Sequence, residues 1–546
     1  MSRVRESLTP SGLETALVVA AFLALGMVGL ANHEMWRDEL EIWLIARDSG
    51  SVGQLLHNMG TQGHPAVWYL LNFLLTRLTT NPLAMQLLNL VIGASAVALF
   101  FRRAPFSLAQ RLLFCFGYFM LFEFTVISRG YGLGLLLIFA FCIRFQERRR
   151  LDLTGAAILL LLANTTVYGM IIAAHVVLLV AIQALVDRRH RQPWLDPAWV
   201  ASLALVLVGV AVGFGHTLIQ GRAMGPAHVD AYAPAHDLTW VASCLSTAIR
   251  GAVPLPDFSL YHFWNSNVLQ LLPGSSGVFL GALLAVTLLV LATYRFRAKP
   301  ALSLIFILGS ATMLSVTFFV WYGWVRHHGQ VFLWYVVCCW LWYGLAGSNR
   351  AEEDDSPARW SGPAGATLTA LLLLQTIAGA HAYVMDLLHP FSNAKITGQY
   401  LSQDEFADVT LVGSIDYSMQ PVAAYLDRKF YYPESGEYRT FLDWGPSRRL
   451  VPTETVLRDS LKLLKEGRRD VVIVFNFQPG NLEPGETVRL GQDARLRCFA
   501  RFDGALVPDE NYHLCRLYAA RAESEGGDVD SHGGATDNYD REEQKD

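Results

Sequence analysis

The sequence predicts a mainly helical, polytopic membrane protein with a C-terminal α/β domain. Of its 546 residues, 53% are hydrophobic and 16% are charged, which is less charge than a soluble protein of this length carries. Apolar runs near the ~20 residues that cross a bilayer recur through about the first 385 residues. After about residue 385 the composition becomes that of a soluble domain.

Eleven apolar segments are candidate membrane spans. They lie at about residues 13–31, 83–101, 112–127, 131–146, 153–167, 169–186, 198–215, 276–293, 301–320, 329–347 and 363–384. The first segment follows Arg3 and Arg5, but it is long, lacks a convincing small-x-small cleavage site and is followed by many further spans. We therefore expect an uncleaved first span rather than a signal peptide.

The segment 64–78 is apolar but too short to span a bilayer, and it carries polar and aromatic side chains. These are Trp68, Tyr69, Asn72 and Arg77. Such a segment is typical of an interfacial helix, here on the outer leaflet. If it crossed the membrane instead, every later span would invert and the basic loops would face outward.

Basic residues gather in every second connection between the predicted spans. They are Arg102, Arg103 and Arg111; Arg144, Arg148, Arg149 and Arg150; Arg188, Arg189 and Arg191; and Arg295, Arg297 and Lys299. The connection with Arg350 and Arg359 is mixed, because it also holds four acidic residues. Cytoplasmic loops carry the excess of Lys and Arg, so we predict an N-terminus inside and a C-terminus outside.

This topology divides the chain into a membrane domain at 1–384, a periplasmic α/β domain at 385–520 and an acidic, disordered tail at 521–546. In the α/β domain we expect strands at 408–413 and 470–475 and helices at 419–426 and 457–465. Cys498 and Cys515 should lie on adjacent strands, where a disulfide and two buried free thiols both remain open.

The composition also excludes some classes of function. No basic stripe or nucleic-acid-binding motif is present, so we expect no nucleic-acid partner. The seven Cys residues form no CxxC pair and no Cys/His array, which argues against a zinc site.

Carboxylates, arginines and aromatic residues are predicted to meet at the outer face. The first external loop, about 32–82, holds Asp38, Glu39, Glu41 and His64; the connection after the third span holds Glu123, Ser128, Arg129 and Tyr131; the connection after the ninth holds Trp324, Arg326, His327 and His328. A long loop at about 216–274 adds Arg222 and Arg250. Together these groups can activate a hydroxyl, hold a phosphate and stack on a sugar.

Glycosyl transfer from a lipid phosphate needs such groups. A base must take the acceptor proton as positive charge develops on the anomeric carbon. A carboxylate beside a low-dielectric lipid face can have its pKa raised toward neutrality, which suits it to that task. The leaving phosphate needs fixed positive charge, which arginine supplies with bidentate geometry.

Three motifs carry a resemblance to a known family. Asp38-Glu39, the stretch from His64 to Leu70, and Ser128-Arg129-Gly130-Tyr131 resemble the integral-membrane GT-C glycosyltransferases. That group includes protein O-mannosyltransferases and the aminoarabinose transferases of lipid A. The resemblance implies a helical bundle with an external domain and a polyprenyl-phosphate sugar donor, used on the periplasmic side of a bacterial inner membrane.

From the resemblance we expect Asp38 to be the catalytic base or a metal contact, with Glu39 supporting it. Arg129 and Arg326 are expected to bind the donor phosphate, with Glu123, Tyr131, His64 and His327 in support. Three alternatives stay open: an ion pair between Glu123 and Arg129, a role for His64 in shaping the turn at Pro65, and a divalent metal (Mg or Mn) at Asp38.

The sequence therefore favours a membrane glycosyltransferase that uses a polyprenyl-phosphate sugar and acts on a glycan, lipid or protein acceptor. The alternative is a transporter or flippase of lipid-linked glycans, although no internal repeat typical of transporters is seen. A further alternative is a non-catalytic envelope protein whose C-terminal domain does the work.

Overall fold

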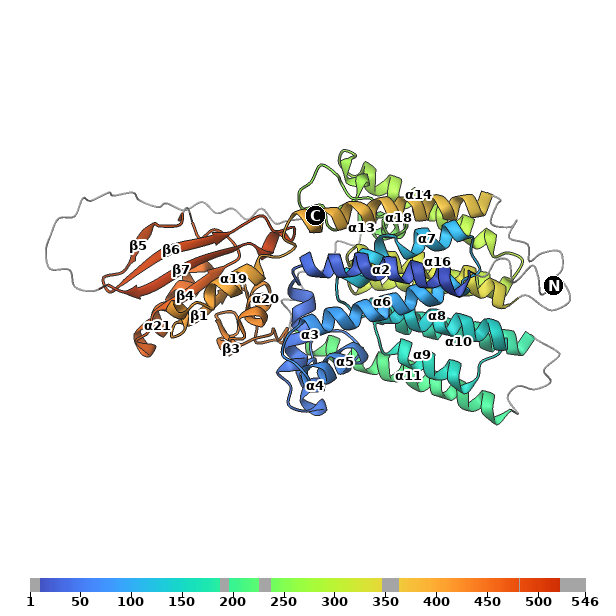
Figure 1. The fold of residues 1–546 in the computed structure, drawn as a ribbon, viewed down its shortest axis with the longest axis horizontal. Coiled ribbons are helices and arrows are strands. Elements are labelled where there is room, and N and C mark those ends of the chain that lie inside the picture. Colours follow the sequence, from blue (N-terminus) through green and yellow to red (C-terminus); the bar gives the residue numbers. More distant parts are fainter. Residues whose placement is uncertain (1–9, 187–195, 225–236, 346–362, 481, 521–546) are drawn as a thin grey trace.

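The computed structural model describes residues 10–186, 196–224, 237–345, 363–480 and 482–520. A bundle of long helices carries a sheet domain at one end (Figure 1). The predicted tail at 521–546 and the basic residues predicted at 188–191, 350 and 359 lie outside the described residues.

The bundle begins with α2 (Gly12–Asn32) and, after the first loop, continues through α6 (Leu83–Arg103). The helix α7 (Leu108–Cys115) leads into the π-helix η1 (Tyr118–Val126). The remaining helices are α8 (Tyr131–Arg148), α9 (Leu153–Ala163), α10 (Val167–Val186), α11 (Pro197–Ala223), α13 (Leu238–Ala252), α14 (Ser276–Arg295), α15 (Pro300–Phe319), α16 (Val325–Gly344) and α18 (Pro363–Leu388), with a short 3-10 turn η3 (Val268–Leu271) before α14.

Eight helical segments of the described chain are long and apolar enough to cross a membrane. They are Gly12–Asn32, Leu83–Arg103, Leu108–Val126, Val167–Val186, Pro197–Ala223, Ser276–Arg295, Pro300–Phe319 and Gly365–Leu388. Each overlaps a predicted span, so the prediction of a multi-pass membrane protein is confirmed.

The other three predicted spans, 131–146, 153–167 and 329–347, are also largely helical. They correspond to α8, α9 and α16, which lie within the bundle (Figure 1). However, α9 has only 11 residues, fewer than the ~20 that cross a bilayer. The count of eleven spans therefore stays a prediction.

The predicted loop at 216–274 is wrong for much of its described length. The helix α11 continues to Ala223, and α13 occupies Leu238–Ala252 and packs against α14 and α16. Asp237 caps α13 by accepting a hydrogen bond from the backbone N–H of Trp240 at 2.8 Å. The polar residues along α13 lower its hydropathy, so the apolar-run criterion missed the helix.

The first loop folds into three short helices, α3 (Arg37–Arg47), α4 (Val52–Asn58) and α5 (Val67–Thr76). At 10 residues, α5 is too short to span a bilayer, which confirms the short helix predicted within 64–78. Trp43 of α3 and Trp68 and Tyr69 of α5 are buried in one apolar cluster. This packing holds α3 at the end of the bundle that carries the sheet domain (Figure 1).

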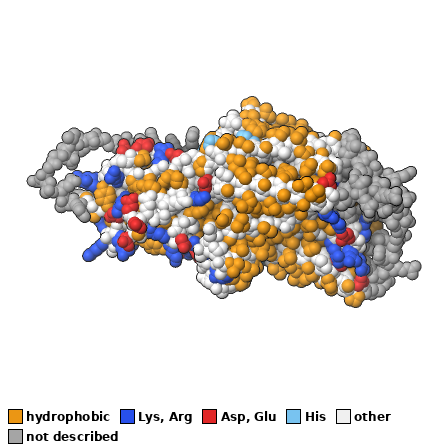
Figure 2. Space-filling view, viewed as in Figure 1, with side chains coloured by type: hydrophobic (Ala, Val, Ile, Leu, Met, Phe, Trp, Pro, Cys, Tyr) orange, Lys and Arg blue, Asp and Glu red, His pale blue; other side chains and the backbone are white. Residues whose placement is uncertain are grey.

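The surface of the bundle suits a lipid environment. Figure 2 shows hydrophobic side chains over most of the helical part and charged ones over the sheet domain and the far end of the bundle. Exposed apolar side chains include Leu13, Val91, Val212, Leu283, Val290 and Ile307. Exposing so continuous an apolar surface to water is unfavourable, so this surface indicates contact with lipid.

The C-terminal part is a seven-stranded mixed sheet with the order β3-β2-β1-β4-β7-β6-β5. Its elements are α19 (Ala394–Leu401), η5 (Asp404–Phe406), β1 (Thr410–Ser414), α20 (Asp416–Leu426), β2 (Phe430–Tyr432), β3 (Glu437–Arg439), α21 (Thr453–Gly467), β4 (Val471–Phe475), β5 (Thr487–Leu490), β6 (Ala494–Phe502), η6 (Pro508–Glu510) and β7 (Tyr512–Ala519). Only β1 pairs in parallel, with β2 and β4. The α/β prediction and its four elements are confirmed.

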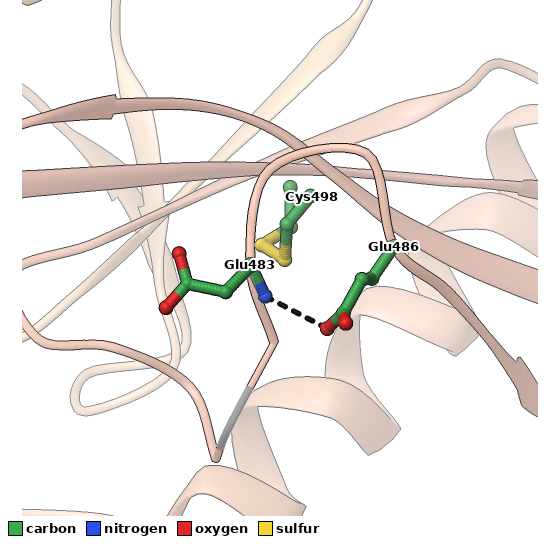
Figure 3. The surroundings of a disulfide bond; sticks show 4 residues. Glu483, Glu486 and Cys498 are labelled. Carbon is green, nitrogen blue, oxygen red and sulfur yellow. Dashed lines mark hydrogen bonds between the residues drawn. A yellow bond between two sulfur atoms is a disulfide. The ribbon is translucent and has the colours of Figure 1, made fainter.

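Cys498 and Cys515 form a disulfide between β6 and β7, where they stand opposite each other in register. A loop runs beside it, in which the backbone N–H of Glu483 donates a 2.9 Å hydrogen bond to the carboxylate of Glu486 (Figure 3). The backbone N–H of Gly485 donates to the carbonyl of Cys498 at 2.8 Å, which fixes this loop against β6. Of the two open alternatives, the structure has the disulfide.

We predict that replacing both bonded cysteines with alanine destabilises the sheet domain. A disulfide closing a loop of this size contributes about 3 kcal/mol in the chain-entropy model, and the two cysteines lie 17 positions apart. Thermal unfolding of the full-length protein, with and without reductant, measures the loss. The matched control is Cys244→Ala, which removes a buried free thiol of α13. Equal melting curves for the double variant and the unreduced wild type would contradict the prediction.

Candidate active site

Asp38 accepts hydrogen bonds from two arginines that come from distant parts of the chain. Its Oδ2 lies 2.6 Å from Nη1 of Arg129 and 2.8 Å from Nη2 of Arg326. Arg129 precedes α8, Arg326 lies in the first turn of α16, and Asp38 lies in the first turn of α3. The two guanidinium side chains are 8% and 4% exposed, so their charges need this carboxylate as a counter-ion.

Arg326 has further hydrogen-bonding capacity. Its guanidinium lies over the rings of Trp36 and Trp264, with Cζ 5.4 Å and 5.7 Å from their centroids. Within the described part of the chain, its buried Nε and Nη1 atoms find no hydrogen-bond acceptor. A buried charged donor without an acceptor is costly, so this end of Arg326 is suited to an anionic ligand.

A small open pocket of about 290 Å³ lies beside this cluster. It is lined by Ile42, His64, Pro65, Trp68, Tyr69, Arg129, Gly130, Tyr131, Thr165 and Thr166. Gly130 permits the close approach of α5, because a Cβ there would lie 3.1 Å from Cβ and Cγ of Trp68. The pocket joins aromatic faces, hydroxyls and one arginine, which is a typical lining for a small-molecule site.

Glu39 is fully buried and faces away from Asp38 into the protein. Its Oε1 accepts a hydrogen bond from the backbone N–H of Ser128 at 2.6 Å, and its Oε2 lies 3.0 Å from Nε2 of His33. Nδ1 of His33 lies 3.0 Å from Asp386 of α18. Glu39 therefore fixes the segment that carries Arg129.

Glu41 lies one helical turn after Asp38, on the same face of α3. Its Oε1 accepts a hydrogen bond from Nε2 of Gln62 at 3.2 Å, and Gln420 of the sheet domain also bonds its side chain. Burial, together with the charge of Asp38, raises the pKa of Glu41 to about 7. The sequence identified Glu41 only as one of the acidic residues of this loop.

The expectation that a carboxylate of this site has its pKa raised toward neutrality holds for Glu41 but not for Asp38. Burial would raise the pKa of its carboxyl, but the adjacent charges of Arg129, Arg326 and Arg37 outweigh burial and lower it. Asp38 therefore stays ionised at neutral pH. The expectation failed for Asp38 because the sequence could not show two guanidiniums converging on one carboxylate.

Glu123 is paired with neutral donors rather than with Arg129. Its Oε2 accepts hydrogen bonds from the hydroxyl of Tyr118 at 2.8 Å and from Nε1 of Trp264 at 3.2 Å. The proposed ion pair with Arg129 is therefore not formed. Since Trp264 also packs on Arg326, Glu123 acts on the cluster through that indole.

The remaining predicted residues, Tyr131, His64 and His327, lie at the pocket or close to it. Tyr131 lines the pocket, and the ring of His327 packs 6.0 Å from it, centroid to centroid. His64 also lines the pocket, and its backbone is held by Gln220, whose amide bonds both its N–H and its carbonyl. Burial and the charge of Arg129 lower the pKa of His64 to about 3, so its imidazole is neutral.

A divalent metal does not fit the donors around Asp38. Two guanidiniums occupy its Oδ2, and their positive charges would oppose a cation. Over the described ranges, no group of three or more His, Cys, Asp or Glu side chains is arranged to hold a metal ion. The chemistry of this cluster suits an anion.

The sheet domain contacts the same loop. Arg37 forms an ion pair with Asp509, and its backbone N–H donates a 2.9 Å hydrogen bond to Oε1 of Glu510. The helix α20 packs on α3, and the hydroxyl of Tyr425 accepts a hydrogen bond from the backbone N–H of Met35 at 3.1 Å. Asp509 and Glu510 of the sheet domain thus contact Arg37, the residue next to Asp38 in the first loop.

Two solved structures of ArnT from Cupriavidus metallidurans match the chain. One, bound to undecaprenyl phosphate, has 15% identity and a TM-score of 0.45, and the match covers 93% of this chain and 98% of that one. The other, in the apo state, has 15% identity and a TM-score of 0.41, with 92% and 97% covered.

The chain thus has a structural match to ArnT. ArnT is a GT-C aminoarabinose transferase, which is one of the groups that the sequence resembles. No protein-family model matches the chain, and no curated protein matches it.

We predict that protonated His33 stabilises the fold in a pH-dependent way. Burial would lower its pKa, but Asp386 and Glu39 outweigh burial and raise it well above the ordinary value. The stabilisation is therefore complete below the unfolded pKa of about 6.5 and is lost as the pH rises through the higher folded pKa.

The measurement is thermal unfolding of wild type and His33→Gln in detergent, from about pH 6 to about pH 10. We expect the wild type to melt higher at low pH and the gap between the two proteins to narrow as pH rises. His57→Gln, at an exposed position of α4, is the matched control. A gap that is constant over the whole range would contradict the prediction.

Proposed function

We propose that the chain is a membrane glycosyltransferase that moves a sugar from a polyprenyl-phosphate donor to an acceptor at the periplasmic face of a bacterial inner membrane. The observation that carries the proposal is the convergence of Arg129 and Arg326 on Asp38, beside an open pocket, at one end of a lipid-exposed bundle.

The two arginines suit a phosphate leaving group. Both keep their charge at any physiological pH, and guanidiniums bind phosphate oxygens in bidentate geometry. The unused Nε and Nη1 of Arg326 supply two such donors within the described chain. A phosphate here would share the arginines with Asp38, which holds them in place when no ligand is bound.

An apolar cavity supports a donor with a hydrocarbon tail. The cavity has an empty volume of about 300 Å³ and is lined by Ala248, Ala252, Leu288, Leu289, Ala292, Phe306, Val331, Phe332, Tyr335 and Leu371. Val331 lies five residues after Arg326 on α16, roughly 7.5 Å along the helix axis. The helix α16 thus carries both Arg326, the residue proposed to bind the phosphate, and, further along, residues that line the apolar cavity.

The pocket beside Arg129 supports a sugar at the other side of the phosphate. Trp68, Tyr69 and Tyr131 offer aromatic faces, and Thr165 and Thr166 offer hydroxyls. In this arrangement the sugar ring lies in the pocket and the phosphate contacts Arg129 and Arg326. The anomeric carbon, which joins the two, lies between them. Asp38 organises the arginines, and Glu39 organises the Ser128–Arg129 segment.

The basic side chains support the orientation of the site. Arg103 at the end of α6 forms an ion pair with Glu147 near the end of α8, and Arg102 lies near the start of α2. These helix ends lie away from the sheet domain (Figure 1). With the basic end inside the cell, we propose that α8, α9 and α16 also cross, giving eleven spans, and that the sheet domain is periplasmic.

The same placement argues against the transporter alternative. Transport sites lie near the middle of the membrane, often at broken helices. Here the cluster of Asp38 with two arginines lies at the ends of α3 and α16, beside the sheet domain. Its contacts with that domain also argue against a sheet domain that works alone as a sensor.

We predict that Arg326→Gln and Arg129→Gln each reduce sugar transfer about 10²- to 10³-fold, the usual loss when a charge-stabilising donor is removed. Asp38→Asn should also reduce transfer, because the arginines then lose their shared anchor. The measurement is movement of label from radiolabelled polyprenyl-phosphate sugars, extracted from bacterial membranes, into an acceptor fraction. Binding of undecaprenyl phosphate to the purified variants is measured in parallel.

The matched control is Arg458→Gln, because the Arg458 side chain lies on α21 and is 72% exposed. It should transfer and bind as the wild type does. If a folded Arg326→Gln protein transfers sugar as fast as the wild type, Arg326 does not bind the donor phosphate. If the folded wild type moves no label, the protein is not a glycosyltransferase for these donors.

A further inference from the structure

Asp38 is poorly arranged to take a proton during the reaction. Its Oδ2 already accepts two short charged hydrogen bonds, and its Oδ1 faces the guanidinium of Arg37 at 3.8 Å. Proton transfer to this carboxylate would remove the negative charge that three arginines share. An efficient base needs a free oxygen and a proton affinity near neutrality.

Glu41 lacks these constraints. It shares a face of α3 with Asp38, but its hydrogen bonds come from two neutral amides, those of Gln62 and Gln420. It is partly exposed, and it interacts electrostatically with Tyr69 and Arg129, both of which line the pocket.

Glu41 also faces the sheet domain. Gln420 belongs to α20, and Gln62, the other amide partner, lies 3.4 Å from the carbonyl of Leu442 in the same domain. The carboxyl of Glu41 therefore lies on the side of α3 that faces the sheet domain. An acceptor arriving from outside the membrane would approach by this side.

We propose that Glu41 is the general base that takes the proton from the acceptor hydroxyl. This assignment rests on the proposed function and names a residue of the same site. The acceptor oxygen forms a bond to the anomeric carbon while its proton moves to a carboxylate oxygen of Glu41. The anomeric C–O bond to phosphate breaks, and its electron pair leaves with the phosphate held by Arg129 and Arg326.

The charges around Glu41 agree with this role. The titratable and charged groups that face it are Asp38 on its own helix, Arg129 before α8, and Tyr69 on α5. Burial and Asp38 raise its pKa to about 7, against the smaller lowering effect of Arg129. At neutral pH a large fraction of Glu41 is therefore ionised and able to accept a proton.

The test compares Glu41→Gln, Glu41→Asp and wild type in the full-length protein, with labelled polyprenyl-phosphate sugars from bacterial membranes as donor. We expect Glu41→Gln to lower kcat about 10²- to 10⁴-fold, the usual contribution of a general base. KM for the donor and binding of undecaprenyl phosphate should stay near wild type. Glu41→Asp should keep part of the activity.

The pH profile separates catalysis from a structural role. Wild-type kcat should fall as the pH decreases through about 7, because Glu41 becomes protonated. The residual activity of Glu41→Gln should lack this limb, and small carboxylates such as formate should restore part of it. Glu466→Gln, at an exposed position of α21, is the matched control and should keep the wild-type profile.

The outcomes distinguish the two assignments. A Glu41→Gln protein with wild-type kcat, or one that keeps the limb near pH 7, overturns the role of Glu41 and leaves the transferase intact. Loss of undecaprenyl phosphate binding without a change in the pH profile also overturns it, since Glu41 would then be structural. A folded wild type that transfers no sugar overturns both assignments.

Discussion

Two buried guanidiniums at one end of a membrane bundle impose the main constraint on this structure. Arg129 and Arg326 are almost entirely removed from water, and both bind one oxygen of Asp38, whose single negative charge they share. Because buried charge without a partner costs several kcal/mol, the first turn of α3, the start of α8 and the start of α16 must stay together. Two of these elements line the pocket, through Ile42 of α3 and through Arg129, Gly130 and Tyr131 at the start of α8.

A second layer of polar contacts keeps that meeting point fixed. Glu39 ties α3 to the backbone of Ser128 and, through His33, to Asp386 of α18. Glu123 accepts the indole N–H of Trp264, whose ring covers Arg326. Each contact joins elements far apart in sequence, so no reacting group depends on a single loop for its position.

The sequence predicted much of the fold, and it placed Asp38, Arg129 and Arg326, which the structure brings together, at one face, because apolar runs and basic loops place segments on one side of a membrane. It did not predict how charges pair. Asp38 and Glu39 look alike in sequence, but successive residues of a helix point in different directions. Glu39 is therefore buried against Ser128, whereas Glu41 shares the face of Asp38. Likewise, α13 was missed because its polar residues mask a helix held by packing.

The ion pair between Arg37 and Asp509 links the beginning of the chain to its end. During synthesis the first loop emerges before the later spans, while Asp509 and Glu510 emerge after the last of them. Arg37 thus lacks the carboxylate of Asp509 until the sheet has folded against α3, and before that it faces only the neighbouring Asp38 among the carboxylates described around it. The order of translation makes completion of the C-terminal domain the final step in assembling the site, so a prematurely ended chain would insert in the membrane without a finished centre.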